Sequence, residues 1–388
     1  MPAMITSGRR TLKRTINAFL RRARRRRRAR IVLVAAAEIS GDKARRIKER
    51  LNFFVGSLPG KVSVRFTRRV SWRSAMMADV VLEADQGIVT AGLRRAFDHI
   101  FNVDFESNPM DAWDLARANQ LLNALPDPGD RAASHSRLIR AVERCRSMGH
   151  AKTYIFGTGP SLQEALKHDF SDGVVVVCNT IVRDDALWRH LNPDFVMAGD
   201  ALYHFGHTAH AKAFRADLRQ RLLESRGKTL FVYPETFHGI VRDELGDLDE
   251  LLIPVPIGDH TDIDVDLCAQ FELPALGNVL NALLLPLACT LTPEVCLWGF
   301  DGRAPNDKLF WANSSRHSYP ELMPALREEH PAFFAHFVPP SKEKSYVESV
   351  HGDELDRRLT VAEARGFTFT MMHFSWTDTL NKRRREPV

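Results

Sequence analysis

The sequence has few cysteines and no long apolar run, and each shortage excludes a class of protein. Its five cysteines form no CxxC pair, which argues against a disulfide framework or a zinc site and favours a reducing compartment. No uninterrupted apolar run approaches the roughly 18 residues of a membrane-spanning helix. The richest stretch, residues 279–300, is interrupted by polar residues and prolines, so we interpret it as a buried helix followed by a strand.

Acidic residues are absent from residues 1–30, which hold 12 of the 54 lysines and arginines. The other 358 residues hold 42 bases and 48 acids, a net charge of −6, so we expect no nucleic-acid partner for the body of the protein. Among the bases, Leu12, Ile16, Phe19 and Leu20 recur at helical spacing. We therefore expect residues 9–30 to form a basic amphipathic helix that binds an anionic membrane surface; the alternatives are a solvated tail and a nucleic-acid arm.

The apolar piece that follows the basic segment, residues 31–37, imitates a signal peptide. It is short, however, and Glu38 follows it at once, so we interpret it as a first β-strand. We expect a cytoplasmic protein that associates peripherally with the inner face of the membrane.

The alternation of apolar and charged pieces divides the rest of the chain. Residues 31–105 predict a small α/β region: strands at 31–37, 61–66 and 78–85, a charged helix to about Phe54 and a helix near 92–101. Residues 106–150 predict a helical linker that is interrupted by PDPGD at 126–130. From residue 151 to 388, apolar runs alternate with helical segments, which predicts a Rossmann-like parallel sheet with helices on both faces.

Glycines and polar residues follow three successive predicted strands of the larger domain. TYIF (153–156) is followed by the GTGPSL of residues 157–162, VVVV (174–177) by Cys178 and Asn179, and DFVMA (194–198) by Gly199 and Asp200. In a parallel sheet, ligands bind beyond the carboxyl ends of the strands. The free amides at the start of the first helix suit phosphate. The pattern argues against NAD, because the third glycine of GxGxxG and the acid after the second strand are both missing.

These motifs occur in an order that resembles the bacterial lipooligosaccharide sialyltransferases, which use a CMP-activated donor without a metal. The order comprises GTGPSL, VVVVCN, NPDFVMAGD, a helix and strand ending in WGFDG, and Val350-His351 before a last helix and strand. It is also similar to a wider superfamily with motility accessory proteins and archaeal pterin diphosphokinases. The resemblance covers roughly 230 residues.

The resemblance implies a role for each matching residue. The residues it assigns to the donor nucleotide are Gly157, Gly159, Ser161, Asn179, Asp200, Gly277 and Asn278, and we expect Thr158 and Pro160 of the same loop to lie at the nucleotide as well. His351 matches the family's general base, a role that suits the near-neutral pKa of histidine. Candidate contacts to the donor or acceptor are Asp301, Arg303 and Tyr346.

The chain departs from the family at three places. Thr158 stands where the family usually has an asparagine, and no arginine precedes Gly277 as it does in the family. Arg303, Phe310 and Trp311 stand where the family has the tyrosines of a lid. Residues 311–334, rich in aromatic residues, histidine and proline, suggest a lid or an ordinary packed excursion.

Two groups of residues raise the alternative of a metal site. Asp262, Asp264 and Asp266 follow an apolar run in the DxD manner of many metal-dependent transferases, although alternating acids are also common in solvated loops. His204, His207 and His210 are three residues apart, as ligands on one helix face would be. We expect no metal and no cofactor, in keeping with the metal-independent family.

The sequence thus predicts a glycosyltransferase, sialyltransferase-like, that moves a sugar from a CMP-activated donor to a hydroxyl of a surface glycan or glycolipid. The alternatives are a diphosphokinase or other nucleotide-dependent phosphotransferase on the same scaffold, and a membrane-attached protein that binds a nucleotide without catalysis.

Overall fold

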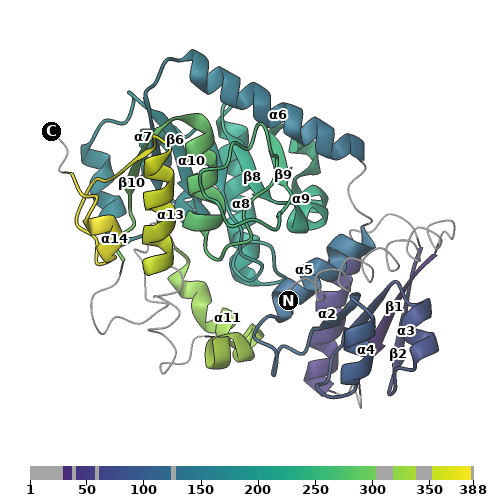
Figure 1. Cartoon of the computed structure of the whole chain (residues 1–388). Coiled ribbons are helices and arrows are strands. Elements are labelled where there is room, and N and C mark those ends of the chain that lie inside the picture. Colours follow the sequence, from purple (N-terminus) through teal and green to yellow (C-terminus); the bar gives the residue numbers. More distant parts are fainter. Residues whose placement is uncertain are drawn as a thin grey trace. The chain divides into compact units, whose positions relative to one another are not determined.

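A computed structural model describes residues 29–36, 41–56, 61–123, 128–302, 318–337 and 352–385. The chain divides into two compact units (Figure 1). Unit 1 comprises residues 1–125 and 329–337, and unit 2 comprises residues 126–328 and 338–388. No helix of the described ranges combines the length and the apolar character that a bilayer crossing requires.

Unit 1 contains a four-stranded parallel sheet in the order β2-β1-β3-β4. The strands are β1 (Ala29–Ala35), β2 (Lys61–Thr67), β3 (Val80–Glu83) and β4 (Ile100–Asn102). The helices are α2 (Gly41–Gly56), α3 (Trp72–Met77), α4 (Ala91–Ala96) and α5 (Asp111–Leu122). The small α/β region predicted from the sequence is therefore present.

The helix predicted near residues 92–101 was wrong in its second half. α4 ends at Ala96, and Phe97 has an extended backbone. Ile100 to Asn102 then pair with β3, and Phe101 is buried in the sheet. A three-residue strand is too short to show the alternation by which strands are recognised in a sequence.

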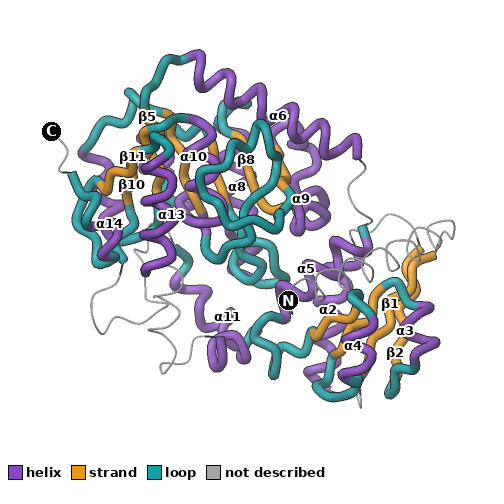
Figure 2. The backbone as a smooth tube through the Cα atoms, in the orientation of Figure 1, coloured by secondary structure: helices purple, strands orange, loops and turns teal. Residues whose placement is uncertain are grey.

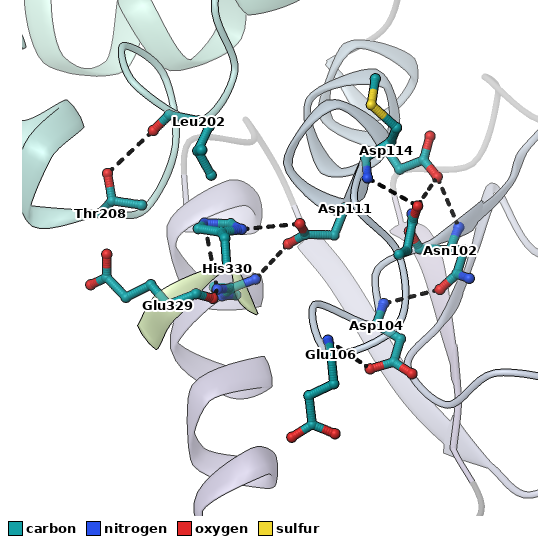
Figure 3. Close-up of polar contacts among 12 residues, drawn as sticks. Asn102, Asp104, Glu106, Asp111, Asp114, Leu202, Thr208, Glu329 and His330 are labelled. Carbon is teal, nitrogen blue, oxygen red and sulfur yellow. Dashed lines mark hydrogen bonds and ion pairs between the residues drawn. The ribbon is translucent and has the colours of Figure 1, made fainter. Parts of the chain in front are cut away.

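The segment Glu329–Phe337, far along the chain, is part of unit 1, where His330 and the Glu329 carbonyl form hydrogen bonds with the buried ion pair of Arg50 and Asp111. Asp111 accepts a hydrogen bond from Arg50 at 2.6 Å. It also accepts one from the His330 ring, at 3.0 Å (Figure 3). Arg50 also donates to the carbonyl oxygen of Glu329, and its guanidinium lies 4.4 Å from the centre of the Phe105 ring. Burial lowers the pKa of His330, so at neutral pH its neutral ring donates from Nδ1–H.

Unit 2 contains a seven-stranded parallel sheet in the order β11-β10-β5-β6-β7-β8-β9. The strands are β5 (Lys152–Phe156), β6 (Val174–Cys178), β7 (Phe195–Met197), β8 (Leu230–Pro234), β9 (Leu252–Val255), β10 (Glu294–Trp298) and β11 (Thr368–Met371). Strand order reverses at β5, whose neighbours are the next strand and the sixth strand of the unit. The predicted Rossmann-like α/β class is confirmed.

Helices cover both faces of the larger sheet (Figure 2). On one face, α6 (Pro128–Ser147), α10 (Leu285–Leu291) and α13 (Asp353–Ala364) share a core with Ile155, Val176 and other strand residues. The other face carries α7 (Asp185–Leu191), α8 (Ala209–Glu224) and α9 (His238–Leu245). On that face Phe205 packs against Phe231, Tyr233 and Phe237.

Shorter helices connect these elements. The 3₁₀-helices are η1 (Pro160–Lys167), η2 (Asn179–Arg183), η3 (Glu235–Phe237), η4 (Gly246–Leu251) and η6 (Pro320–Leu322). The π-helices are η5 (Leu280–Leu284) and η7 (Phe333–Phe337). The remaining α-helices are α11 (Met323–Glu329) and α14 (Asp378–Asn381).

The buried helix predicted in the first part of residues 279–300 consists of two parts, η5 and α10. Leu285 donates its amide to the carbonyl of Leu280, the wider spacing of a π-helix, and Pro286 follows. Because proline has no amide hydrogen and crowds the preceding turn, a widened turn accommodates it. The helix starts after Asn278 and not at Gly277, because Asn278 has a left-handed backbone (φ 60°).

The boundaries of the two units differ from the predicted domains. The predicted linker, residues 106–150, contains α5 in unit 1 and α6 in unit 2. The predicted catalytic domain, residues 151–388, is interrupted by residues 329–337, which belong to unit 1. The predicted basic helix at residues 9–30 lies outside the described residues except for the start of β1.

Candidate functional site

The residues predicted to bind a nucleotide follow neighbouring strands of the seven-stranded sheet. β5 pairs with β6, and β6 pairs with β7, all in parallel. The segment 157–161, Asn179 and Asp200 therefore lie along one edge of the sheet, beyond the carboxyl ends of three adjacent strands. The helix that opens after Asn278 runs antiparallel to β10, so its first turn faces the same edge.

Glycines allow the chain after β5 to approach the chain after β10 at the point where strand order reverses. Gly157 donates to the carbonyl of Trp298 at 2.7 Å, and Gly159 donates to the carbonyl of Gly299 at 2.8 Å. A Cβ atom at Gly299 would lie 2.3 Å from the Gly157 oxygen, and Gly299 has φ +77°. A Cβ atom at Gly159 would lie 2.1 Å from the Asp301 carboxylate. The GxG motif is thus required by contact between two loops.

Ser161, Asp301 and His373 form a hydrogen-bonded cluster beside these glycines. Asp301 accepts from the Ser161 amide at 3.0 Å, and its second oxygen lies 2.8 Å from the Ser161 hydroxyl. The same hydroxyl lies 2.7 Å from His373 Nε2, which also accepts from the Gly299 amide at 2.9 Å. His373 therefore carries its proton on Nδ1, which donates to the carbonyl of Phe374 at 2.7 Å. The cluster ties together the ends of β5, β10 and β11.

This cluster bears on the expectation that the GTGPSL loop binds phosphate. The amides of Gly159 and Ser161 already donate to protein oxygens, and the Asp301 carboxylate stands at the first turn of η1, where an anion was expected. A phosphate at these two amides would have to displace the Gly299 carbonyl from one and Asp301 from the other. The roles of Gly157, Thr158, Gly159, Pro160 and Ser161 at the phosphate stay predictions.

Asn179 has an unusual backbone and an unpaired oxygen. Its φ is +51°, a left-handed conformation that asparagine tolerates better than most residues. Its side-chain Oδ1 is buried and has no hydrogen-bond partner among the residues that the structure describes. Leaving a buried acceptor unpaired costs about 1–3 kcal/mol. Such an atom offers a place for a ligand's hydrogen-bond donor, and the predicted role of Asn179 at the nucleotide stays a prediction.

Asp200 follows the next strand and has a shifted pKa. Its Oδ1 accepts from the amides of Leu202 and Tyr203, each at 2.8 Å. Burial raises its pKa to about 6, although these two hydrogen bonds act in the opposite direction. Asp200 is thus a carboxyl group that changes its charge near neutral pH, a property typical of functional sites.

The histidines after Asp200 are engaged within the protein. His204 Nδ1 accepts from the Asp200 amide at 3.2 Å, and His210 Nδ1 donates to the carbonyl of Tyr203 at 3.0 Å. Burial lowers the pKa of both rings, which keeps them neutral. The two side chains thus serve the local fold.

Two acids of the DxD-like stretch, Asp264 and Asp266, also form hydrogen bonds within the protein. Asp264 pairs with Arg365 at 2.7 Å, and Asp266 accepts from the Cys268 amide at 2.9 Å. Across the described ranges, His, Cys, Asp and Glu side chains form no group of three that could hold a metal ion.

Gly277 and Asn278 have different surroundings. A Cβ atom at Gly277 would meet no atom within 4 Å, so this position is open. Asn278 accepts from the amide of Asn281 at 2.9 Å through its side chain and so caps the first turn of the helix.

Three predicted residues, His351, Arg303 and Tyr346, lie outside the described residues, as does the first part of the predicted lid, residues 311–317. Their predicted roles stay predictions. His373, in contrast, was missed. Its signal was available, because it follows the apolar run FTFTMM just as Asn179 follows VVVV.

A second polar group lies beyond the carboxyl ends of the smaller sheet in unit 1. Lys43 Nζ lies 3.1 Å from Asp85, 3.0 Å from Asp104 and 2.9 Å from Glu106. Burial lowers the pKa of Lys43, but the hydrogen bonds that its ammonium group donates to the three carboxylates outweigh this effect and raise the pKa above its ordinary value. Asp104 and Glu106 belong to the loop after β4 shown in Figure 3. Internal ion pairs account for this cluster.

No protein-family model matches the chain, and a search of curated proteins finds no significant match.

The contact between the two glycine loops makes a prediction about stability. Gly299→Ala should lower the free energy of unfolding by about 3 kcal/mol or more, because the methyl group meets the Gly157 oxygen and the left-handed backbone is strained. Gly366→Ala is the control: φ is +100° there, but no atom lies within 4 Å of the new carbon, so backbone strain of about 1–2 kcal/mol should act alone. Equal losses in urea unfolding would show that the loops do not need the close approach.

Proposed function

We propose that unit 2 is a glycosyltransferase domain that binds a nucleotide-activated sugar, CMP-linked by preference, at the carboxyl ends of β5, β6 and β7. The observation that carries the proposal is the pair formed by Asn179 and Asp200 after two adjacent strands. One offers a buried oxygen without a described partner, and the other a carboxyl group whose pKa is about 6.

Each of these groups suits one part of a cytidine. The unpaired Asn179 oxygen accepts from a donor such as the exocyclic amino group of the base or a ribose hydroxyl. The ionised Asp200 carboxylate accepts from ribose hydroxyls. Ligand binding would then supply the hydrogen bond that Asn179 lacks, which explains why the protein tolerates a costly buried acceptor.

In the proposed reaction, an acceptor hydroxyl attacks the anomeric carbon of the sugar, and its oxygen forms the new glycosidic bond. The bond from that carbon to the phosphate oxygen breaks, and the nucleoside monophosphate leaves with the electron pair. The hydroxyl proton passes to His351, whose role is implied by the resemblance to the sialyltransferases. Acceptors on a surface glycan or glycolipid fit this chemistry.

Asn179→Gly tests the nucleotide site without disturbing the backbone, because glycine adopts φ +51° at no steric cost. We expect the variant to be about as stable as the parent and to bind CMP at least about tenfold more weakly, since it loses one buried hydrogen bond. Thermal shift with CMP, UDP, ADP, ATP and GTP, with and without Mg²⁺, measures both quantities.

The matched control is Asn192→Gly, which changes another left-handed asparagine, at the end of α7. It should leave CMP binding unchanged. Stabilisation of the parent by ATP with Mg²⁺ and not by CMP would contradict the proposal and favour phosphotransfer.

Transfer itself is tested at His351. His351→Ala should leave CMP binding intact and reduce CMP release from a CMP-activated sugar, in the presence of a glycan acceptor, by about 10² or more, the usual size of a general-base contribution. His351→Gln serves as a second variant that keeps a polar side chain. Turnover equal to the parent's in both variants would remove His351 from the mechanism while leaving nucleotide binding standing.

A further inference from the structure

The edge of the sheet in unit 1 combines exposed apolar side chains with positive charge. Phe66 on β2 is 57% exposed, and on α3 the exposed fractions are 59% for Trp72, 43% for Met76 and 45% for Met77. Large apolar side chains exposed singly are common, but four within twelve residues form a surface that calls for a partner.

The same stretch carries bases and no acid. Residues 61–78 contain Lys61 and four arginines, at positions 65, 68, 69 and 73, and neither aspartate nor glutamate. Arg65, Arg69 and Arg73 are exposed. The partner of this surface is therefore expected to carry negative charge.

The local structure fixes these side chains in place. The hydroxyl of Thr67 accepts from the Arg69 amide at 3.2 Å and donates to the Arg69 carbonyl at 2.7 Å, which shapes the turn after β2. Ser71 and Ser74 form a capping box at the start of α3. Ala75 on the inner side of α3 is buried in the core cluster that also contains Leu33 and Leu93, whereas Trp72, Met76 and Met77 of this helix are exposed.

The apolar side chains flank both faces of the edge strand. Arg65 pairs with Leu33 in the parallel register and Phe66 with Val34, so Arg65 lies on the face that α3 covers and Phe66 on the opposite face. β2 is the outermost strand of the sheet. A broad surface that lies along this edge can therefore meet Phe66 on one side and the residues of α3 on the other.

We propose that this edge, the β2–α3 surface, binds an anionic lipid membrane. Tryptophan and phenylalanine are side chains that insert into the interfacial region, and arginines around them bind lipid phosphates. The charge of the neighbouring chain supports this partner: β1 pairs with β2 from Ala29 and Lys61 onward, and the segment before β1 holds bases and no acid. The inference is independent of the proposed enzymatic function.

Vesicle sedimentation with the full-length protein tests the proposal. The probes are vesicles of phosphatidylcholine alone and of equal parts phosphatidylcholine and phosphatidylglycerol. The parent should bind only the anionic vesicles, and less as salt rises. An apolar variant, Phe66→Ser with Trp72→Ser, and a basic variant, Arg65→Gln with Arg69→Gln and Arg73→Gln, should each bind at least about tenfold more weakly.

Matched control variants remove the same types of side chain from unit 2, so that they test whether the position on the β2–α3 surface matters. Phe374→Ser with Trp376→Ser removes two exposed aromatic side chains of unit 2, and Arg140→Gln with Arg189→Gln and Arg357→Gln removes three exposed charges there. Both controls should bind like the parent. Because Trp72 also packs against Phe97, with ring centres 5.5 Å apart, Met76→Ser with Met77→Ser is a second apolar variant that spares this contact and should still weaken binding.

Two results would overturn the proposal. One is that the parent fails to bind anionic vesicles. The other is that the β2–α3 variants bind them as tightly as the parent; if the same variants then lose binding to a single-stranded RNA, the surface is assigned to nucleic acid.

Discussion

The candidate site depends on the close approach of two chain segments, the one after β5 and the one after β10. At Gly157 and Gly299 the two backbones touch, and only the absence of a Cβ atom allows it. This contact brings the η1 start against Asp301, so that the helix amide and the Ser161 hydroxyl are both satisfied by one carboxylate. The same contact positions His373, whose ring accepts from the Gly299 amide.

At β5, where the strand order of the sheet reverses, the loops of the chain form hydrogen bonds with each other, and this affects where a ligand can bind. In open parallel sheets a ligand usually occupies that point and takes its hydrogen bonds from the first loop. Here the amides of the first loop already donate to protein acceptors, whereas the next strand is followed by Asn179, whose side-chain oxygen has no hydrogen-bond partner in the described part of the chain. The polar side chains that a ligand could reach therefore follow β6 and β7. Asp200, after β7, adds a carboxyl group whose pKa is raised.

Most strands of the larger sheet could be predicted from the sequence, because apolar runs such as VVVV are long enough to identify a strand. The polar residue after such a run then marks the carboxyl end of the strand. Sheet order could not be predicted, since no residue encodes that β10 inserts beside β5. The contact of Ser161 with Asp301 spans 140 positions and depends on that order. The short strand β4 and the position of Glu329–Phe337 in unit 1 could not be predicted for a similar reason. Both depend on tertiary contacts: the pairing of β4 with β3 and the hydrogen bond between Asp111 and His330.

The central claim is that a nucleoside is held between Asn179 and Asp200. Calorimetric titration of cytidine, which has no phosphate to titrate, tests it most directly between pH 5 and pH 7. A ribose hydroxyl that donates to Asp200 favours the ionised carboxylate, so affinity should rise with pH through the pKa of about 6 and be about tenfold lower at pH 5 than at pH 7. Asp200→Asn should remove this dependence. An identical pH profile in the parent and the variant, or no binding of cytidine at any pH, would contradict the account.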